Sequence, residues 1–284
     1  MKRYMLKNVI KSVLIATAVL FTACDKIDSD DYLIYSGSNG EWVNGSSVTD
    51  KEQRVFVEKY TGVRCVNCPD ADVAISQIQS SLGHKIIAVS IHAGGMARPY
   101  SGYEDFRTET GEAWNTYFGI QANPSVMVNR SMNNGIPNII TDVAAVSGAV
   151  NSALSQNGNI AMEMTSTFNA DNGNGYVDVS LEFLEKVADE LTITLLVTED
   201  GIIGKQLEHG GVNENYEFNH VFRMTITDLW GADVVANGEK GTCRSARFEY
   251  SLPSNYNAEK CHIVGFISKK NTREIIQSAE TSLM

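Results

Sequence analysis

The order of apolar and polar positions changes character near the middle of this 284-residue chain. In residues 53–157, near-continuous apolar runs alternate with stretches whose apolar residues recur every three or four positions. The first pattern is typical of strands buried on both faces, and the second of amphipathic helices. In residues 158–284, apolar and polar residues alternate over short runs, as in strands with one buried face. The pattern therefore predicts an α/β domain followed by an all-β domain.

The α/β half contains three predicted strands and three predicted helices. We expect strands over residues 55–60, 85–91 and 122–128, and helices over residues 70–82, 110–118 and 139–154. An insertion, residues 96–119, separates the second strand from the third and contains the middle helix. The third strand opens around Pro124, which is tolerated there because the first residue of a strand need not donate a hydrogen bond.

The second half contains short alternating runs separated by turn residues such as Asn172-Gly173 and Asn237-Gly238. We expect strands over residues 160–168, 176–183, 191–198, 221–227, 247–252, 262–268 and 273–278. About seven short strands with this spacing predict an immunoglobulin-like sandwich. The stretch 204–216 is expected to be a long loop.

The amino terminus does not fit either domain. Within residues 1–23, basic residues precede a short apolar run, and Thr22-Ala23 comes directly before Cys24. This order resembles a bacterial lipoprotein signal and implies that Cys24 is lipidated and anchors the chain to a membrane. Ordinary signal cleavage, with Cys24 a bystander, is the alternative. Residues 24–52 are acidic and lack periodicity, so we expect a flexible tether.

Charge and motifs exclude several classes of function. The chain carries 34 acidic and 23 basic residues, a net charge of −11, which argues against nucleic acid as a partner. It has no dinucleotide fingerprint or phosphate-binding loop, and its five histidines lack metal-ligand spacing. We therefore expect neither a cofactor nor a metal.

The candidate chemistry lies between the first strand and the first helix. Two residues separate Cys65 from Cys68 at that junction. This is the spacing of a thiol–disulfide exchange motif. A helix amino terminus stabilises a thiolate, and Arg64 adds a positive charge, so Cys65 is the predicted attacking thiol and Cys68 the resolving thiol. The alternative is a static Cys65–Cys68 disulfide.

The order of strand, Cys-x-x-Cys, helix, strand, insertion, proline-started strand and helix resembles the thioredoxin fold. The resemblance implies that Pro124 is a cis proline facing the dithiol and that Asn123 helps to line the substrate-docking edge. It also implies a buried carboxylate, Glu58, that accepts a proton from Cys68, and it places His92 on the same rim. The alternatives are an ordinary edge-strand start for Pro124 and structural roles for Glu58 and His92.

Several stretches resemble a narrower family, the outer membrane protein 28-related lipoproteins of Bacteroidetes. The matching stretches are Glu58–Gly62 with Cys65–Pro69, Val89–Gly94, Asn123–Ser125 with Asn129-Arg130, and Phe218–Arg223. This resemblance implies an outer membrane lipoprotein with a thioredoxin-like domain and a β-rich carboxy-terminal domain. It brings no settled activity.

Two functions remain open from the sequence. The first is thiol–disulfide exchange on exported proteins. The second is a non-enzymatic surface lipoprotein that binds a protein or host ligand, with a structural dithiol. A disulfide between Cys243 and Cys261 is disfavoured, because the strands that they precede should start at opposite ends of the sandwich.

Overall fold

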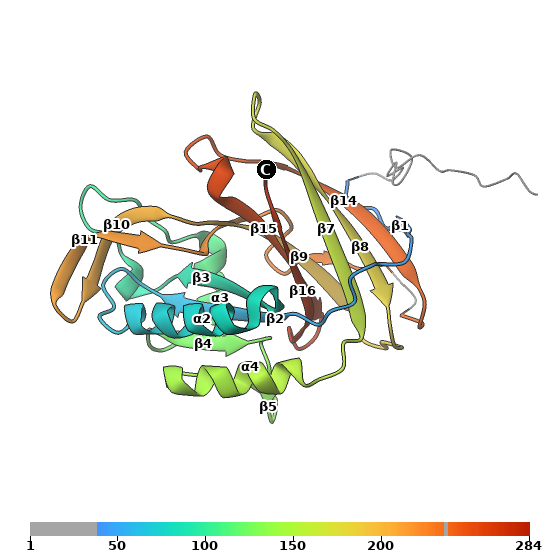
Figure 1. Ribbon diagram of the computed structural model, residues 1–284, viewed down its shortest axis with the longest axis horizontal. Helices are drawn as coiled ribbons and strands as arrows, with labels where there is room; N and C mark the ends of the chain where they lie inside the picture. The colour runs from blue at the N-terminus through green and yellow to red at the C-terminus, as the bar shows by residue number, and fades with distance from the viewer. Residues whose placement is uncertain (1–38, 236–237) are drawn as a thin grey trace, which may run out of the picture. The chain divides into compact units, whose positions relative to one another are not determined.

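The computed structural model describes residues 39–235 and 238–284, and most of its regular structure is β-sheet. The larger sheet is mixed, in the order β16-β15-β9-β12-β3-β2-β4, with β13 paired to β9. Figure 1 labels β2, β3, β4, β9, β15 and β16 of this sheet. Its strands are β2 (Val55–Thr61), β3 (Ile86–His92), β4 (Ser125–Val128), β9 (Leu191–Glu199), β12 (Val221–Thr225), β13 (Ala232–Asp233), β15 (Cys261–Lys269) and β16 (Ile275–Ser282). Strand β3 is parallel to both of its neighbours, β2 and β12.

A second, antiparallel sheet has four strands in the order β1-β14-β8-β7. Its strands are β1 (Val43–Asn44), β14 (Cys243–Ser251), β8 (Asn174–Phe183) and β7 (Ile160–Asn169). One core cluster contains Met162 and Val179 from this sheet together with Leu195 and Ile263 from the larger sheet. The two sheets therefore pack face to face through the apolar side of each alternating strand.

Helices cover both faces of the larger sheet where β2, β3 and β4 lie. The helices are α2 (Cys68–Leu82), α3 (Glu109–Phe118) and α4 (Val146–Leu154), with 3-10 turns at Gly83–Lys85, Gly95–Ala97, Val143–Ala145 and Ala258–Lys260. Val57 of β2 packs with α2 and α4, whereas its neighbour Phe56 packs with Trp114 of α3. Successive strand side chains point to opposite faces, so odd-numbered residues of β2 face α2 and even-numbered residues face α3.

The expected boundary between residues 157 and 158 does not coincide with a break in the sheet. Strands β2, β3 and β4 precede this boundary, and β9, β12, β15 and β16 follow it, yet all belong to one sheet. The reason is visible in β9, whose residues are all buried because both of its faces are covered. The threonines of β9 give its sequence an alternation of apolar and polar residues. That alternation predicts a strand with one exposed face, as in a separate sandwich.

Two further elements differ from the sequence-based expectation. The predicted loop 204–216 is largely a hairpin of β10 (Ile202–Glu208) and β11 (Gly211–Phe218), which pair with each other. A small hairpin of β5 (Met132–Asn133) and β6 (Ile136–Pro137) follows β4. The hairpin β10–β11 escaped prediction because Asn213, Glu214 and Asn215 interrupt the apolar alternation.

The described part of the expected tether packs against the four-stranded sheet. Strand β1 pairs with β14, and Val48 is buried with its backbone N–H donating to Glu182. Residues 1–38, which hold the predicted signal segment and Cys24, lie outside the described residues. Among residues 39–235 and 238–284, no helix has the length and apolar character needed to cross a membrane.

Candidate functional site

The two cysteines of the Cys-x-x-Cys motif form a disulfide at the start of α2. Cys65 and Cys68 are bonded, with their Cα atoms 5.4 Å apart, and Cys68 is the first residue of the helix. Asn67 occupies the N-cap position but its side chain makes no capping hydrogen bond. The Cys68 N–H donates to the Cys65 carbonyl at 3.3 Å and Pro69 has no N–H, so the helix dipole is what favours negative charge on a sulfur placed there.

Strand register brings the other predicted residues to the same end of the sheet. Thr61, the last residue of β2, pairs with His92 of β3, and Tyr60 pairs with Ser125 of β4. The Asn123–Pro124 peptide bond that precedes β4 is cis. The Asn123 side chain donates to the carbonyl of Ala93, 3.4 Å away. His92, Asn123 and Pro124 therefore lie at the same end of the sheet as the cysteine loop, residues 62–67, which connects β2 to α2.

Arg64 is held by the insertion. Its Nε atom donates to the Arg98 carbonyl at 2.8 Å and its Nη2 atom to the Pro99 carbonyl at 2.9 Å. The guanidinium carbon also lies 4.1 Å from the ring centroid of Tyr100. These contacts fasten the insertion to the cysteine loop, and the predicted effect of Arg64 on a Cys65 thiolate stays a prediction.

Glu58 lies on the opposite face of the sheet from α2, which corrects the role predicted for it. Its Oε2 atom is 2.8 Å from Nη2 of Arg130, and its Oε1 atom accepts a hydrogen bond of 2.9 Å from the Tyr60 hydroxyl. Glu58 and Arg130 are both buried, and the guanidinium stacks on Trp114 of α3. The strand alternation that puts Val57 under α2 turns Glu58 to the other face of the sheet, where it pairs with Arg130 and not with the motif.

The ionisable residue of β2 that faces α2 is Lys59, which the sequence analysis did not select. It is buried, it forms an ion pair with Asp72 of α2, and burial lowers the pKa of its amine to about 7. Asp72 also accepts a hydrogen bond of 2.9 Å from the hydroxyl of Tyr216 in β11. This cluster joins β2, α2 and the hairpin. In the sequence, the position of Asp72 one helical turn after Cys68 was the available signal that an acidic partner for Lys59 lies on α2.

His92 is enclosed by aromatic rings. Only 2% of its surface is exposed, and its ring centroid lies 5.0 Å from that of Phe106 and 5.7 Å from that of Phe218. Burial lowers its pKa to about 3, and the cations of Lys59 and Arg223 act in the same direction. His92 is therefore neutral near pH 7 and supplies no positive charge to a thiolate.

The hairpin β10–β11 lies over the cysteine loop. The backbone N–H of Leu207 donates to the Val63 carbonyl at 2.9 Å, and the side-chain amide of Gln206 donates to the Cys65 carbonyl at 2.9 Å. Cys65 and Cys68 are 2% and 1% exposed. The disulfide is thus covered, and β10 supplies part of the cover.

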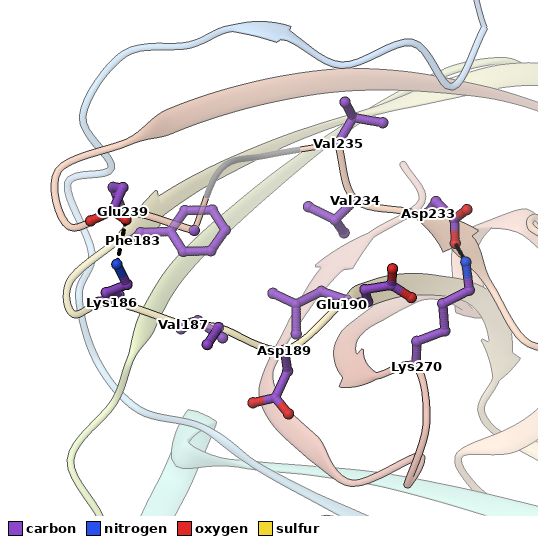
Figure 2. Close-up of a pocket in the computed structure, with 13 residues that line it drawn as sticks. Phe183, Lys186, Val187, Asp189, Glu190, Asp233, Val234, Val235, Glu239 and Lys270 are labelled. Carbon is purple, nitrogen blue, oxygen red and sulfur yellow. Dashed lines mark hydrogen bonds and ion pairs between the residues drawn. The ribbon is translucent and has the colours of Figure 1, made fainter.

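A separate cavity of about 470 Å³ lies in the second half of the chain (Figure 2). Phe183, Val187 and Leu191 line it, and ion pairs Lys186–Glu239 at 2.6 Å and Lys270–Asp233 at 2.7 Å lie around it. None of the predicted site residues lines this cavity. The described ranges also contain no cluster of three or more side chains suited to hold a metal ion.

Cys243 and Cys261 are free thiols. Cys243 begins β14 in the four-stranded sheet, whereas Cys261 begins β15 in the larger sheet. Burial raises the pKa of the Cys261 thiol to about 12, which makes it unreactive.

Thiol counting should distinguish these two cysteines from the motif. For a soluble chain that begins at residue 25, unfolding without reductant is expected to expose two alkylatable thiols, and unfolding with reductant four. Mass spectrometry of the alkylated chain checks both numbers. A Cys243→Ser control should lower each count by one, and a count of zero before reduction would contradict the assignment.

Comparison with known proteins places this chain in a family. A family model described as "Outer membrane protein Omp28" matches residues 111–283, more than half of the chain. The chain belongs to the Omp28 family. Its location is accordingly the outer membrane of the cell envelope. The match includes Pro124 and the second half but begins after the Cys65–Cys68 disulfide.

One solved structure, HBP35, shares the fold of this Omp28-family chain. HBP35 of Porphyromonas gingivalis has a TM-score of 0.66 and 17% sequence identity, over 82% of this chain and 76% of that one. A domain of the outer membrane lipoprotein Omp28 from Porphyromonas gingivalis is 18% identical over 44% of this chain and 88% of that one, with a TM-score of 0.33. No curated protein matches the chain. At these identities the likeness concerns fold alone.

Proposed function

We propose that the Cys65–Cys68 disulfide is a redox couple for thiol–disulfide exchange with exported proteins. The observation that carries the proposal is the position of the disulfide between the cysteine loop and the first residue of α2. Reduction there creates a thiolate at the positive end of the helix dipole, which lowers the pKa of the sulfur. The proposal includes a thioredoxin-like arrangement of β2, α2, β3, β4 and α4, with strands of the second half extending the sheet.

In the oxidising direction, a client thiolate attacks Sγ of Cys65 and the Cys65–Cys68 bond breaks. Cys68 leaves as a thiolate, and a mixed disulfide joins the client to Cys65. A second client thiolate then attacks the client sulfur of that mixed disulfide, and Cys65 leaves. The client loses two electrons and gains a disulfide, while Cys65 and Cys68 become a dithiol and take up the two protons. Reduction of a client is the same sequence in reverse.

A second candidate is favoured by the burial of both cysteines. In that case the disulfide only fixes the loop between β2 and α2, and the protein binds a partner protein or host ligand without chemistry. Under either function, lipidation of Cys24 would hold the protein at the membrane and leave the described residues in the aqueous phase.

Redox titration of the soluble chain from residue 25 tests the proposal. We expect a reversible Cys65–Cys68 couple in glutathione buffers. We also expect Cys68→Ser to trap mixed disulfides through Cys65 at least tenfold more than Cys65→Ser, because the resolving thiol is missing. Alkylation followed by electrophoresis measures both. A potential below about −300 mV together with no trapped client favours the structural disulfide.

A further inference from the structure

We propose that the β10–β11 hairpin is a displaceable cover that controls access to the Cys65–Cys68 disulfide. The hairpin touches the cysteine loop through Leu207 and Gln206, and it touches α2 through Tyr216 and His209. The inference deepens the proposed function and rests on it for its biological use. Access to the sulfur atoms, however, can be measured with no client present.

Gln206 makes the most specific contact between the hairpin and the cysteine loop. Its side chain is buried. The Nε2 atom donates to the Cys65 carbonyl at 2.9 Å, to the Leu207 carbonyl at 3.0 Å and to the Gly62 carbonyl at 3.5 Å. Beside it, the Leu207 N–H donates to the Val63 carbonyl. The strand β10 therefore closes over the loop by satisfying its backbone carbonyl groups.

The contacts of the hairpin with α2 are few and polar. The Tyr216 hydroxyl donates to Asp72 at 2.9 Å, and His209 lies 3.2 Å from Asp70. The side chains of His209 and Asp70 are both 66% exposed, so solvent screens that pair and it contributes little. Tyr216 is thus the stronger link between the hairpin and the helix.

The base of the hairpin packs in an apolar cluster, whereas its tip is held by hydrogen bonds to the cysteine loop and by one exposed pair with α2. Phe218, the last residue of β11, is buried with Phe106 and Val63 in one apolar cluster. Towards the tip, Gly211 and Val212 are exposed, and neither strand pairs with a third strand of the described chain. A two-stranded hairpin is marginally stable alone, so it can open locally without unfolding the two main sheets.

Reduction kinetics test the cover. The probe is dithiothreitol in large excess, and the readout is the rate at which Cys65 and Cys68 become alkylatable in the soluble chain from residue 25. Tyr216→Phe removes one hydrogen bond and should raise this rate about fivefold, since a hydrogen bond contributes about 1 kcal/mol. Gln206→Ala should raise it by at least tenfold. Hydrogen exchange at the Leu207 amide should accelerate by a similar factor in each variant.

Tyr117→Phe is the matched control, because Tyr117 is 52% exposed on α3 and does not contact the hairpin residues named above. It should leave the rate unchanged. The cover is refuted if the unaltered protein is reduced as fast as oxidised glutathione, or if Tyr216→Phe behaves like Tyr117→Phe. Should Gln206→Ala fail to fold, Tyr216→Phe still decides the matter.

The outcomes also separate the cover from the proposed function. If Tyr216→Phe speeds reduction but no client is ever trapped on Cys65, the cover stands and exchange with exported proteins fails. If clients are trapped on Cys65 of the Cys68→Ser variant, but the unaltered protein and the Tyr216→Phe variant are reduced at one rate, exchange stands and the cover fails.

Discussion

Replacing Glu58 with glutamine is expected to lower the free energy of unfolding by about 3–5 kcal/mol. The change leaves the guanidinium of Arg130 without its counter-charge, in a site formed by Trp114, Phe118 and Phe266. The effect is large because both partners are buried, and the guanidinium cannot recover hydration without opening the aromatic site. Urea denaturation at pH 7 measures it through the midpoint, with the slope unchanged.

Two controls fix the cause of that loss. The double variant Glu58→Gln with Arg130→Met should recover most of the stability, because it removes the unpaired charge and keeps an apolar side chain of similar length. Lys240→Met breaks an exposed pair with Glu185 and should cost less than about 1 kcal/mol. A loss below 1 kcal/mol for Glu58→Gln would show that the buried pair is not essential to the fold.

Acid should destabilise the protein through His92. The folded state holds the pKa of His92 at about 3, whereas an unfolded chain has a value near 6.5. The unfolded state therefore binds more protons between these pH values, and stability that is complete above pH 6.5 is lost as the pH falls towards 3. At about 1.4 kcal/mol for each unit, the loss from this residue is about 2 kcal/mol at pH 5.

The contribution of His92 can be separated from that of the carboxylates by comparison between variants. The cations of Lys59 and Arg223 face His92 and oppose its protonation, whereas Asp105 favours it. His92→Leu should flatten the dependence of unfolding free energy on pH between 7 and 5. His84→Gln removes an exposed histidine that pairs with Glu52, and it is the comparison variant for loss of a surface histidine. Equal slopes for His92→Leu and the unaltered protein would contradict the prediction.

Local sequence patterns predict the elements around the disulfide well. Each predicted strand and helix of residues 53–157 has a counterpart, although α2 begins at Cys68, two residues before the predicted start. These elements depend on neighbouring residues, which is why the sequence alone contains them. The cis conformation of Pro124 is present as well, and it was expected only from the resemblance to the thioredoxin fold.

Features set by distant residues could not be predicted in the same way. Alternation shows that Glu58 and Lys59 point to opposite faces, but it does not show which face α2 will cover. The cover over Cys65 depends on Gln206 and Leu207, which are far along the chain. The polar residues of the hairpin interrupt the apolar alternation by which its strands could have been predicted. The glycine pair Gly210-Gly211, where the turn His209-Gly210 meets β11, was a local signal for it.

The parallel pairing of β3 with β12 has a consequence for a shortened chain. Ser90 of β3 pairs with Val221 of β12, so this edge of β3 has no partner when the second half is missing. An unpaired, apolar strand edge invites pairing with other chains. Residues 53–157 produced alone are therefore expected to aggregate, although they contain the whole Cys-x-x-Cys motif.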